Sequence, residues 1–340
     1  MRAIEYAQTG TADVLRLVDR EPRAPGAGEV AIRIVVSGVN PTDWKSRQGT
    51  APGIGLAVPQ VPGHDGAGTI EALGAGVTSF AIGDRVWVWN AAYQRAEGTA
   101  QEIANVPQSQ VVALPDNVSF DVGASIGIPA ITAHRALTAR EGGPEQLARG
   151  SLDGTFVLVT GGAGAVGHAA IQFAVWAGAT VLTTVSGPDK AKLAEAAGAH
   201  HVINYRTEDV AERVRAIAKD GVEVIAEVNA AVNLGLDLTL LRVGGTIASY
   251  AGTPADEATF PVRAAMSANA RLQFLLTYLT SDAQKRAAVD ATTAALQAGA
   301  LGIGAENGLP IIRFPLERAA DAQRAVEAGT VGKVLIDVRS

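Results

Sequence analysis

The stretch "VLVTGGAGAVG", residues 157–167, decides the fold of this chain of 340 residues. Its first half is an apolar run typical of a buried strand, and "GAVGHAAIQFAVWAG", residues 164–178, is typical of a helix. Between the two, Gly161, Gly164 and Gly167 form a G-x-x-G-x-x-G array. Such an array can be a simple tight turn or a ligand-binding loop, so its neighbours must decide.

The sequence after this array alternates between strand and helix patterns. Strands are expected at 179–185, 201–204, 222–228 and 245–251, and helices at 188–198, 208–220 and 233–242. This alternation predicts βαβ units and a doubly wound parallel sheet with helices on both faces. In that context the N–H groups of Gly164, Ala165 and Val166 open a helix toward a pyrophosphate. We therefore predict dinucleotide binding.

The end of the second strand of this domain indicates which dinucleotide binds. Enzymes selective for NAD usually have Asp or Glu there, but residues 184–187 include no acid. Asp189 is acidic, but it lies in a first helical turn, where it complements the helix dipole. Several nearby side chains suit a 2′-phosphate instead: Ser186, Lys190, Tyr205 and Arg206. The sequence therefore favours NADPH.

The first third of the chain has a different character. Short apolar strands, as in "EVAIRIVVSGV" (29–39) and "GDRVWVW" (83–89), are separated by prolines and glycines, and helical periodicity is scarce before residue 122. A long helix is expected at 282–299, and "GKVLIDV" (332–338) is one more strand. A mostly β domain and an α/β domain fit the length of the chain, with a cleft between them.

The composition excludes several classes of protein. There are 34 acidic and 28 basic residues, giving a net charge of -6, so nucleic acid is not an expected partner. There is no cysteine, which removes disulfides and thiolate ligands. Residues 155–188 include no Asp, Glu, Lys or Arg, but glycines split them into strand, helix and strand. We expect buried core there, no membrane partner, and a soluble cytoplasmic protein.

The stretch "VPGHDGAGTI", residues 61–70, places His64 beside Asp65. Catalytic zinc generally needs three protein ligands, and these two residues have no evident third partner. We therefore expect no metal, with the pair shaping the wall of the site and hydrogen-bonding within it. Without a Lewis acid, electron-poor acceptors such as quinones or conjugated enones suit hydride transfer better than alcohols do. A proton must follow the hydride to the acceptor, and Lys45 or solvent could supply it.

These residues resemble a known family, the zinc-free quinone oxidoreductases of the medium-chain dehydrogenase/reductase superfamily, in particular the zeta-crystallin-like group. The resemblance rests on motifs spread over nearly the whole chain: "SGVNPTDWKSRQG" (37–49), "VPGHDGAGTIEALG" (61–74), "IGDRVW" (82–87), "GASIGIPAITAHRAL" (123–137), "TGGAGAVG" (160–167), "GAHHVINYR" (198–206), "AAVNLGLDLTLLRVGGTI" (230–247) and "VGKVLI" (331–336). The chain departs from the family at Trp44 and Lys45, where a tyrosine is common, and at Ala231, which replaces a polar residue.

The resemblance implies both fold and reaction. It implies a GroES-like, mostly β catalytic domain over 1–126, completed by 300–340, and a Rossmann NADPH-binding domain over 127–299. It implies NADPH-dependent reduction of a quinone, with Asn40 and Thr132 beside the nicotinamide. Together with Lys45, which departs from the family but could donate a proton, these two residues are the catalytic candidates. The residues expected to bind the cofactor are Asn40, Thr132, Ala163, Gly164, Ala165, Val166, Gly167, Ser186, Lys190, Tyr205, Ala231, Tyr250, Ala251, Phe274, Leu275, Leu276 and Lys333.

Alternatives remain open at this stage. An NADPH-dependent enoyl or 2-alkenal reductase, acting on α,β-unsaturated carbonyls, would share every cofactor residue. A crystallin-like or RNA-binding role is disfavoured by the intact glycine loop and the acidic charge. The apolar stretch "RLQFLLTYL", residues 271–279, could form an exposed sheet edge, which is an aggregation hazard unless it is paired. Because sheets of this superfamily join edge to edge, we expect a homodimer.

Overall fold

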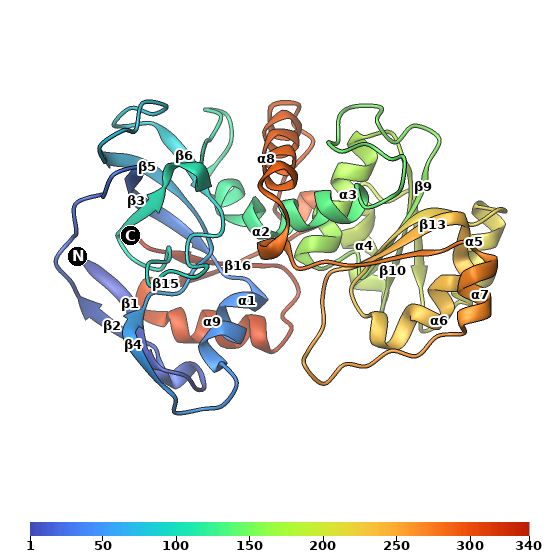
Figure 1. The fold of residues 1–340 in the computed structure, drawn as a ribbon, viewed down its shortest axis with the longest axis horizontal. Helices are drawn as coiled ribbons and strands as arrows, with labels where there is room; N and C mark the ends of the chain where they lie inside the picture. Colours follow the sequence, from blue (N-terminus) through green and yellow to red (C-terminus); the bar gives the residue numbers. More distant parts are fainter. Residues whose placement is uncertain (340) are drawn as a thin grey trace. The chain divides into compact units, whose positions relative to one another are not determined.

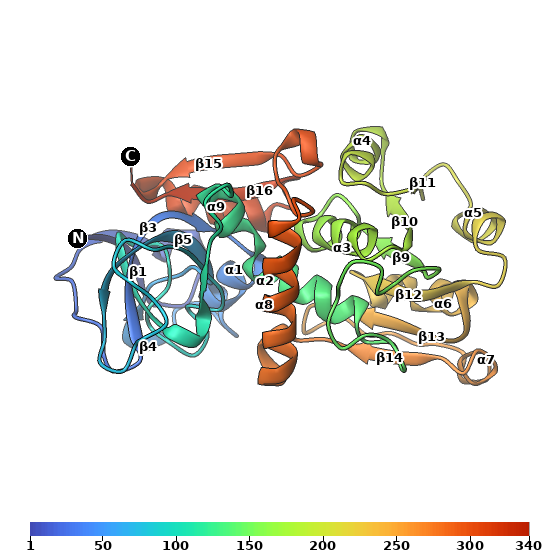
Figure 2. The same cartoon turned by 90° about the horizontal axis from the view of Figure 1, so that it is seen from above.

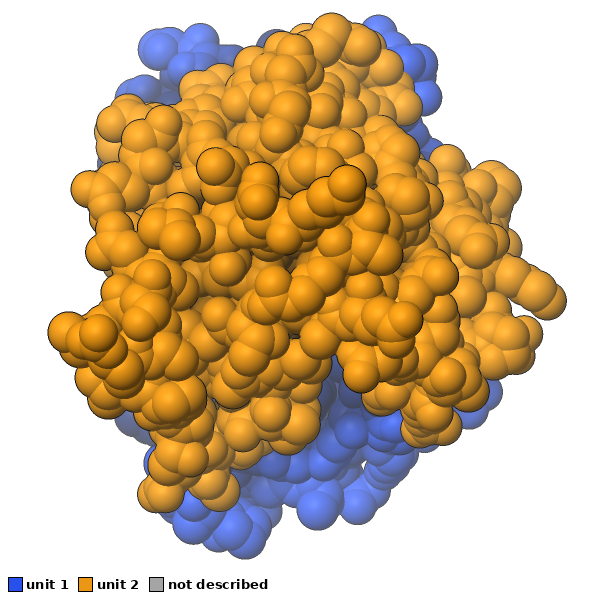
Figure 3. All heavy atoms as spheres, turned by 90° about the vertical axis from the view of Figure 1, so that its right-hand side faces the viewer, with its two compact units in different colours: residues 1–128, 311–340 blue, residues 129–310 orange. Residues whose placement is uncertain are grey.

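The computed structural model describes residues 1–339, which divide into two compact units (Figure 3). Unit 1 holds residues 1–128 and the chain from Ile311 onward, and unit 2 holds Pro129–Pro310. The sequence predicts domain boundaries at 126 and 299, whereas residues 300–310 belong to unit 2 in the structure. They do so because Gly302 exchanges two backbone hydrogen bonds with the side chain of Gln172, and the Asn307 carbonyl accepts one from His168.

Unit 1 is built around strand β3 (Glu29–Gly38), which pairs antiparallel with β5 (Asp65–Leu73), β7 (Ile103–Pro107) and β16 (Lys333–Asp337). The sheet runs in the order β15-β16-β3-β5-β6-β8. A smaller sheet has the order β2-β1-β4. The remaining elements of the unit are β1 (Arg2–Gln8), β2 (Arg16–Asp19), β4 (Gly55–Gln60), β6 (Arg85–Val88), β8 (Val111–Ala113), β15 (Ile311–Pro315), α1 (Pro41–Gln48) and α9 (Ala319–Glu327).

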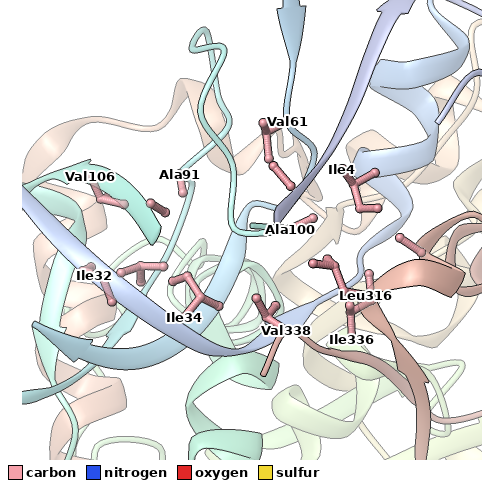
Figure 4. Close-up of a cluster of buried hydrophobic side chains, with 14 of the residues drawn as sticks. Ile4, Ile32, Ile34, Val61, Ala91, Ala100, Val106, Leu316, Ile336 and Val338 are labelled. Atoms are coloured by element: carbon pink, nitrogen blue, oxygen red, sulfur yellow. The ribbon is translucent and has the colours of Figure 1, made fainter. Parts of the chain in front are cut away.

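The core of unit 1 lies between strands from both ends of the chain (Figure 4). Ile32 and Ile34 are two residues apart on β3, so both side chains point to the same face, and neither is exposed to solvent. Val106 of β7, together with Ile336 and Val338 from the C-terminal segment, belongs to the same cluster. Burying each of these side chains contributes about 1.5–3 kcal/mol.

Unit 2 is a parallel sheet of six strands in the order β11-β10-β9-β12-β13-β14. The strands are β9 (Phe156–Thr160), β10 (Thr180–Val185), β11 (His201–Asn204), β12 (Val222–Glu227), β13 (Leu241–Ser249) and β14 (Arg271–Phe274). The chain starts in the middle, moves out to β11 and returns to β12. The strand order therefore reverses between β9 and β12, the place where dinucleotides bind in this fold.

Helices cover both faces of this sheet. In Figure 1, α3 (Ala165–Trp176) and α4 (Pro188–Ala196) lie on one face, while α5 (Val210–Ile217) and α6 (Ala230–Leu240) lie on the other. Figure 2 shows the six strands from above, with α7 (Val262–Ser267) beside β14 at one end. The unit also includes α8 (Asp282–Gln297). The expected doubly wound α/β fold is confirmed.

One helix carries residues of both units. It is α2 (Phe120–Leu137), with Pro129 in its interior at the division. Some expected elements are shorter in the structure: the apolar stretch 271–279 forms only the four-residue strand β14, followed by a 3₁₀ turn, Thr277–Leu279. Within residues 1–339, no helix combines the length and apolar character needed to cross a bilayer.

Candidate functional site

The cofactor residues expected in unit 2 gather at one edge of its sheet, where all six parallel strands end. We call this edge the carboxyl edge. Five strands lead directly into candidate residues: β9 into 161–167, β10 into Ser186, β11 into Tyr205, β13 into Tyr250 and Ala251, and β14 into Leu275 and Leu276. After β12, a short turn leads to Ala231 in the first turn of α6. Ligands of open α/β sheets bind at this end of the strands. The structure therefore brings together residues that are up to about 115 positions apart in the chain.

The glycines of the loop have different structural reasons. Gly161 has φ of 68°, a left-handed conformation that favours glycine. A Cβ on Gly167 would lie 2.5 Å from the carbonyl oxygen of Gly161, so close packing inside the protein requires glycine there. A Cβ on Gly164 would meet nothing nearer than 3.4 Å, so the protein itself does not exclude a side chain at that position. Glycine at 164 instead suits a group that approaches from outside.

Gly164 is the N-cap of α3, and its lack of a side chain leaves the helix without a side-chain cap. The first N–H groups of a helix have no intrahelical acceptor, and together with the helix dipole they attract an anion. Ala165 and Val166 provide such N–H groups beside the glycine. The loop therefore fits a pyrophosphate, as the sequence predicts.

The residues expected at the adenosine phosphate lie on neighbouring strands. Ser186 follows β10 directly, and the Tyr205 N–H donates to the carbonyl of Val185 at 3.1 Å, which places the two strand ends side by side. Lys190 is the third residue of α4 and is half-buried, whereas the side chain of Tyr205 is exposed. Ser186, Lys190 and Tyr205 thus follow neighbouring strand ends or lie in the first turn of α4, on one side of the carboxyl edge.

The residues expected at the nicotinamide lie on the opposite half of the edge. The Leu275 N–H donates to the carbonyl of Ser249 at 2.7 Å, which aligns the segment after β14 with Tyr250. The hydroxyl of Thr132, on α2, is 2.6 Å from that of Thr277. Thr132 is therefore fixed against the segment that follows Phe274 and Leu276, both of which are exposed. Within unit 2, these predicted residues do come together.

In unit 1, Asn40 and Lys333 are hydrogen-bonded to each other. Lys333 donates Nζ to Asn40 Oδ1 at 2.8 Å, and Asn40 donates Nδ2 to Asp65 Oδ2 at 2.8 Å. The three side chains are almost fully buried, with at most 3% of any residue exposed. A buried ammonium and a buried carboxylate thus lie on either side of one amide, which pairs both charges.

Asp65 also holds the middle of α2. Both of its carboxylate oxygens accept from the Ile128 N–H at 3.0 Å. The next residue, Pro129, has no N–H, and a Cβ on Gly127 would lie 2.2 Å from Asp65 Oδ1, so the helix can approach the carboxylate only with glycine there. Burial raises the pKa of Asp65 to about 6, although Lys333, Asn40 and Ile128 oppose the shift.

His64 and Asp65 have separate partners, although they are adjacent. His64 Nδ1 is 2.8 Å from Asp43 Oδ1, whereas Asp65 bonds to Asn40 and Ile128. Successive residues near a strand start point to opposite faces, so neighbours in sequence need not act together. Asp43 is also part of the capping box of α1, because its Oδ2 accepts from the Asn40 N–H at 2.7 Å. The expectation that both residues hydrogen-bond within the domain agrees with these contacts.

Lysine 45 and alanine 231 are the remaining sequence-based candidates. Lys45 is exposed on α1, with its ammonium 5.7 Å from the centre of the Trp44 ring, a cation–π distance. Ala231 is exposed in the first turn of α6. Sequence reasoning missed Asp43, although its place three residues after Asn40 is the signature of a capping box. It also missed Glu227, which is buried at the end of β12.

Comparisons with known proteins agree with this geometry. Residues 26–116 match the family described as "Alcohol dehydrogenase GroES-like domain", and residues 165–293 match "Zinc-binding dehydrogenase". Human quinone oxidoreductase is 32% identical over 340 residues, which cover 99% of this chain and 97% of that protein.

Two solved structures cover 99% of this chain and 99% of their own. One is a quinone oxidoreductase of Pseudomonas syringae, with 28% identity and a TM-score of 0.81. The other is a mycobacterial protein complexed with NADPH, with 32% identity and a TM-score of 0.80. The fold and the carboxyl edge define a member of the medium-chain dehydrogenase/reductase superfamily. Within it, the chain belongs to the quinone oxidoreductase family.

The family description raises the question of zinc, and the residues present do not fit a zinc site. The oxygens of Asp65 bond to Asn40 and Ile128, and Asp43 bonds to His64. Among residues 1–339 no three His, Asp or Glu side chains are grouped to hold a metal, and the sequence has no cysteine. Independence from metal remains a prediction.

Proposed function

We propose that this protein reduces quinones with NADPH, by hydride transfer and without a metal. One quinone, one NADPH and one proton would give one hydroquinone and one NADP⁺. The observation that carries the proposal is the uncapped N-terminus of α3 at the reversal of strand order, in a chain that matches quinone oxidoreductases over its whole length. NADPH supplies the hydride when it is bound.

The chain's own residues would bind and orient the cofactor. Gly164 and the first turn of α3 would hold the pyrophosphate. Ser186, Lys190 and Tyr205 would hold the 2′-phosphate, a choice supported by the lack of an acid after Val185. The groups proposed around the nicotinamide and its ribose are Asn40, Thr132, Ala231, Tyr250, Ala251, Phe274, Leu275, Leu276 and Lys333.

The buried position of Asn40 supports its proposed role as an orienting group. Its amide is held at both ends, by Lys333 and by Asp65, so it would present a fixed edge to whatever it contacts. The proton that follows the hydride would come from Lys45 or from solvent. A pH profile of turnover in Lys45→Met distinguishes the two, because a solvent-derived proton leaves the profile unchanged.

The protein is further proposed to be a homodimer located in the cytoplasm. The dimer is supported by β14, a strand at the end of the sheet, and by exposed apolar side chains in and beside it: Phe274, Leu276 and Leu279. Two copies pairing along β14 would satisfy the open edge. Cell fractionation tests the location.

The decisive test follows NADPH absorbance with a panel of ortho- and para-quinones, 2-alkenals and enoyl thioesters. We expect quinones to be reduced fastest. If conjugated carbonyls are reduced far faster than every quinone, the protein is an enoyl or 2-alkenal reductase. If NADPH binds and nothing in the panel is reduced, the enzymatic proposal fails and a binding role takes its place. Elemental analysis, with turnover measured before and after chelation, tests the absence of a metal requirement.

A further inference from the structure

Two buried acids of unit 2 have no assigned role in the proposed reaction. Glu227 is the last residue of β12 and Asp237 lies in α6, and their exposures are 0% and 1%. Each has one carboxylate oxygen without a hydrogen-bond donor among the described residues: Glu227 Oε2 and Asp237 Oδ2. A buried, unpartnered carboxylate oxygen is costly. One proton held between the two acids would satisfy both oxygens.

The electrostatics of the pair agree with a shared proton. Burial raises the pKa of Asp237, and Glu227 raises it further through both its charge and a hydrogen bond between the two side chains. Two carboxyl groups in contact in a dry environment cannot both ionise at low cost, so the charge of Glu227 favours a proton on Asp237. At neutral pH, the pair therefore keeps one proton.

The same glutamate fastens two parts of the carboxyl edge. Its Oε1 accepts from the Asn229 N–H and, at 3.0 Å, from Asn233 Nδ2. Its backbone carbonyl accepts from the Tyr250 N–H at 3.1 Å. Glu227 thus ties the turn between β12 and α6, which leads to Ala231, to the segment that follows β13.

We propose that Glu227 and Asp237 share one proton and act as positioning residues for the turn at 228–231, so that loss of this proton loosens the turn and weakens dinucleotide binding. The second half of this inference rests on the proposed function of the carboxyl edge. The first half concerns only the folded protein and does not depend on it.

The side chains beside the two acids on the sheet strands do not supply a charge that would remove the shared proton. Tyr250, on the segment after β13, has its pKa raised by burial and by Glu227, so its phenol stays neutral. Glu223 lies on the same strand, but it is paired with Arg242 and accepts from the Phe156 N–H. Strand β9 presents the uncharged Thr160 to β12.

The arginines on the helices that contact α6 are either bonded to groups outside the acid pair or exposed. On α5, Arg215 donates to the carbonyl of Thr239, and Arg213 pairs with Glu208. On α7, Arg263 is exposed. The causes that shift the pKa of Asp237 are burial and Glu227, so the pair and not a neighbouring cation governs its proton.

The direction of the pH effect follows from linkage. The pKa of Asp237 is higher in the folded protein than in the unfolded chain, so the folded state holds more protons above about pH 4. The stability from this proton is complete below about pH 4 and is lost progressively as the pH rises through the neutral and alkaline range. Dinucleotide affinity should fall over the upper part of the same range.

Glu227→Gln tests the inference, because its amide carbonyl can still accept from Asn229 and its NH₂ can donate to Asp237 without titrating. The urea midpoint of the full chain without cofactor, and the Kd of NADPH from fluorescence, are measured at about pH 6 and about pH 9.5. Between these two pH values, the urea midpoint of wild type should fall, and the midpoint of Glu227→Gln should fall clearly less. If only a tenth of the wild-type molecules keep the turn in its binding-competent conformation at the higher pH, the Kd of wild type rises about tenfold more than that of the variant.

Asp237→Asn is the second variant in case Glu227→Gln folds poorly, and Glu195→Gln, an exposed carboxyl on α4, is the matched control. Parallel pH dependence of the urea midpoint in wild type and in both acid-pair variants overturns the shared proton. If the urea midpoints of wild type and variants diverge with pH while their NADPH affinities change in parallel, only the positioning role is overturned. If wild type binds no NADPH at any pH, the proposed function fails, and the urea midpoints still decide the shared proton.

Discussion

Lys333 and Asn40 are joined side chain to side chain although they are 293 positions apart in the chain. The ammonium donates to the amide oxygen, so the amide nitrogen must be the atom that donates to Asp65. This chemistry fixes the orientation of the amide, which electron density alone often leaves ambiguous. Three distant segments, the start of α1, the start of β5 and the start of β16, thereby depend on one another.

Lys333→Met should strongly destabilise unit 1, because it leaves Asp65 buried without its cation. Breaking a buried ion pair by removing one partner costs about 3–5 kcal/mol. Urea unfolding measures the loss, with Lys192→Met, at an exposed lysine, as the control. Adding Asp65→Asn to Lys333→Met should restore part of the stability. A double variant no more stable than Lys333→Met contradicts the pairing.

Asp65 should make stability depend on pH in the weakly acidic range. Its folded pKa of about 6 exceeds its ordinary value, so the stability it contributes is complete below about pH 4 and falls as the pH rises to about 6. At about 1.4 kcal/mol per pH unit, the change amounts to ~3 kcal/mol. Relative to wild type, Asp65→Asn should therefore gain stability across this interval. A difference in unfolding free energy that stays constant with pH argues against the raised pKa.

Lys190→Ala should reduce the preference for NADPH over NADH. If Lys190 contacts the 2′-phosphate, the loss of one charge-assisted hydrogen bond weakens NADPH binding by ~1–3 kcal/mol and leaves NADH binding unchanged. Fluorescence titration of both cofactors measures this. Lys192→Ala is the matched control, because Lys192 lies on the same helix and is mostly exposed. Equal losses for the two cofactors would falsify the assignment.

Gly164→Ala and Gly167→Ala should have opposite consequences. A Cβ at 164 has space and the backbone there is extended, so the protein should fold with its stability changed by less than about 1 kcal/mol. NADPH affinity should nevertheless fall, by about tenfold if the added methyl costs ~1.4 kcal/mol against the pyrophosphate. Gly167→Ala should destabilise the fold itself, because its Cβ meets the Gly161 carbonyl. Thermal melts without cofactor separate the two effects.

Phe274→Pro should shift the expected homodimer toward monomer. The Leu275 N–H donates to β13, so the N–H of Phe274 faces the open edge, and proline removes this donor from edge pairing. Phe274→Val keeps the N–H and is the control. Light scattering at micromolar concentration measures the mass of each form. Wild type that is monomeric at this concentration rules out the dimer.

The architecture of unit 2 could be predicted because its signals are local. Each apolar strand and each helix from residue 156 onward has its own periodicity, and the glycine loop lies within eleven residues of sequence. Helix α1 could not be predicted in the same way. It buries Asp43 and Arg47 instead of an apolar face, so no hydrophobic periodicity announces it. Arg47 is fully buried because it bonds to the Gly10 carbonyl and to Gln323.

The candidate site likewise has one part that the sequence predicts and one part that it does not. Residues of the carboxyl edge follow from strand ends, which the sequence locates well. The partners of Asp65 do not, because Asn40, Ile128 and Lys333 come from three separate regions of the chain. Likewise, nothing in the sequence distinguishes Glu227 and Asp237 from exposed acids, because their burial is a property of the folded structure. Charge pairing through space has no periodic signature in sequence.

The pairing of β16 with β3 has a consequence for how the chain folds during synthesis. Unit 2 is continuous, from Pro129 to Pro310, so the ribosome delivers all of it before unit 1 is complete. At about 5–20 residues per second, β3 and β5 wait many seconds for the strand that carries Lys333. During that time, Asp65 has no cation, and the edge of β3 is open to other nascent chains. We expect chaperones to bind this intermediate, and release to coincide with the emergence of the last strand.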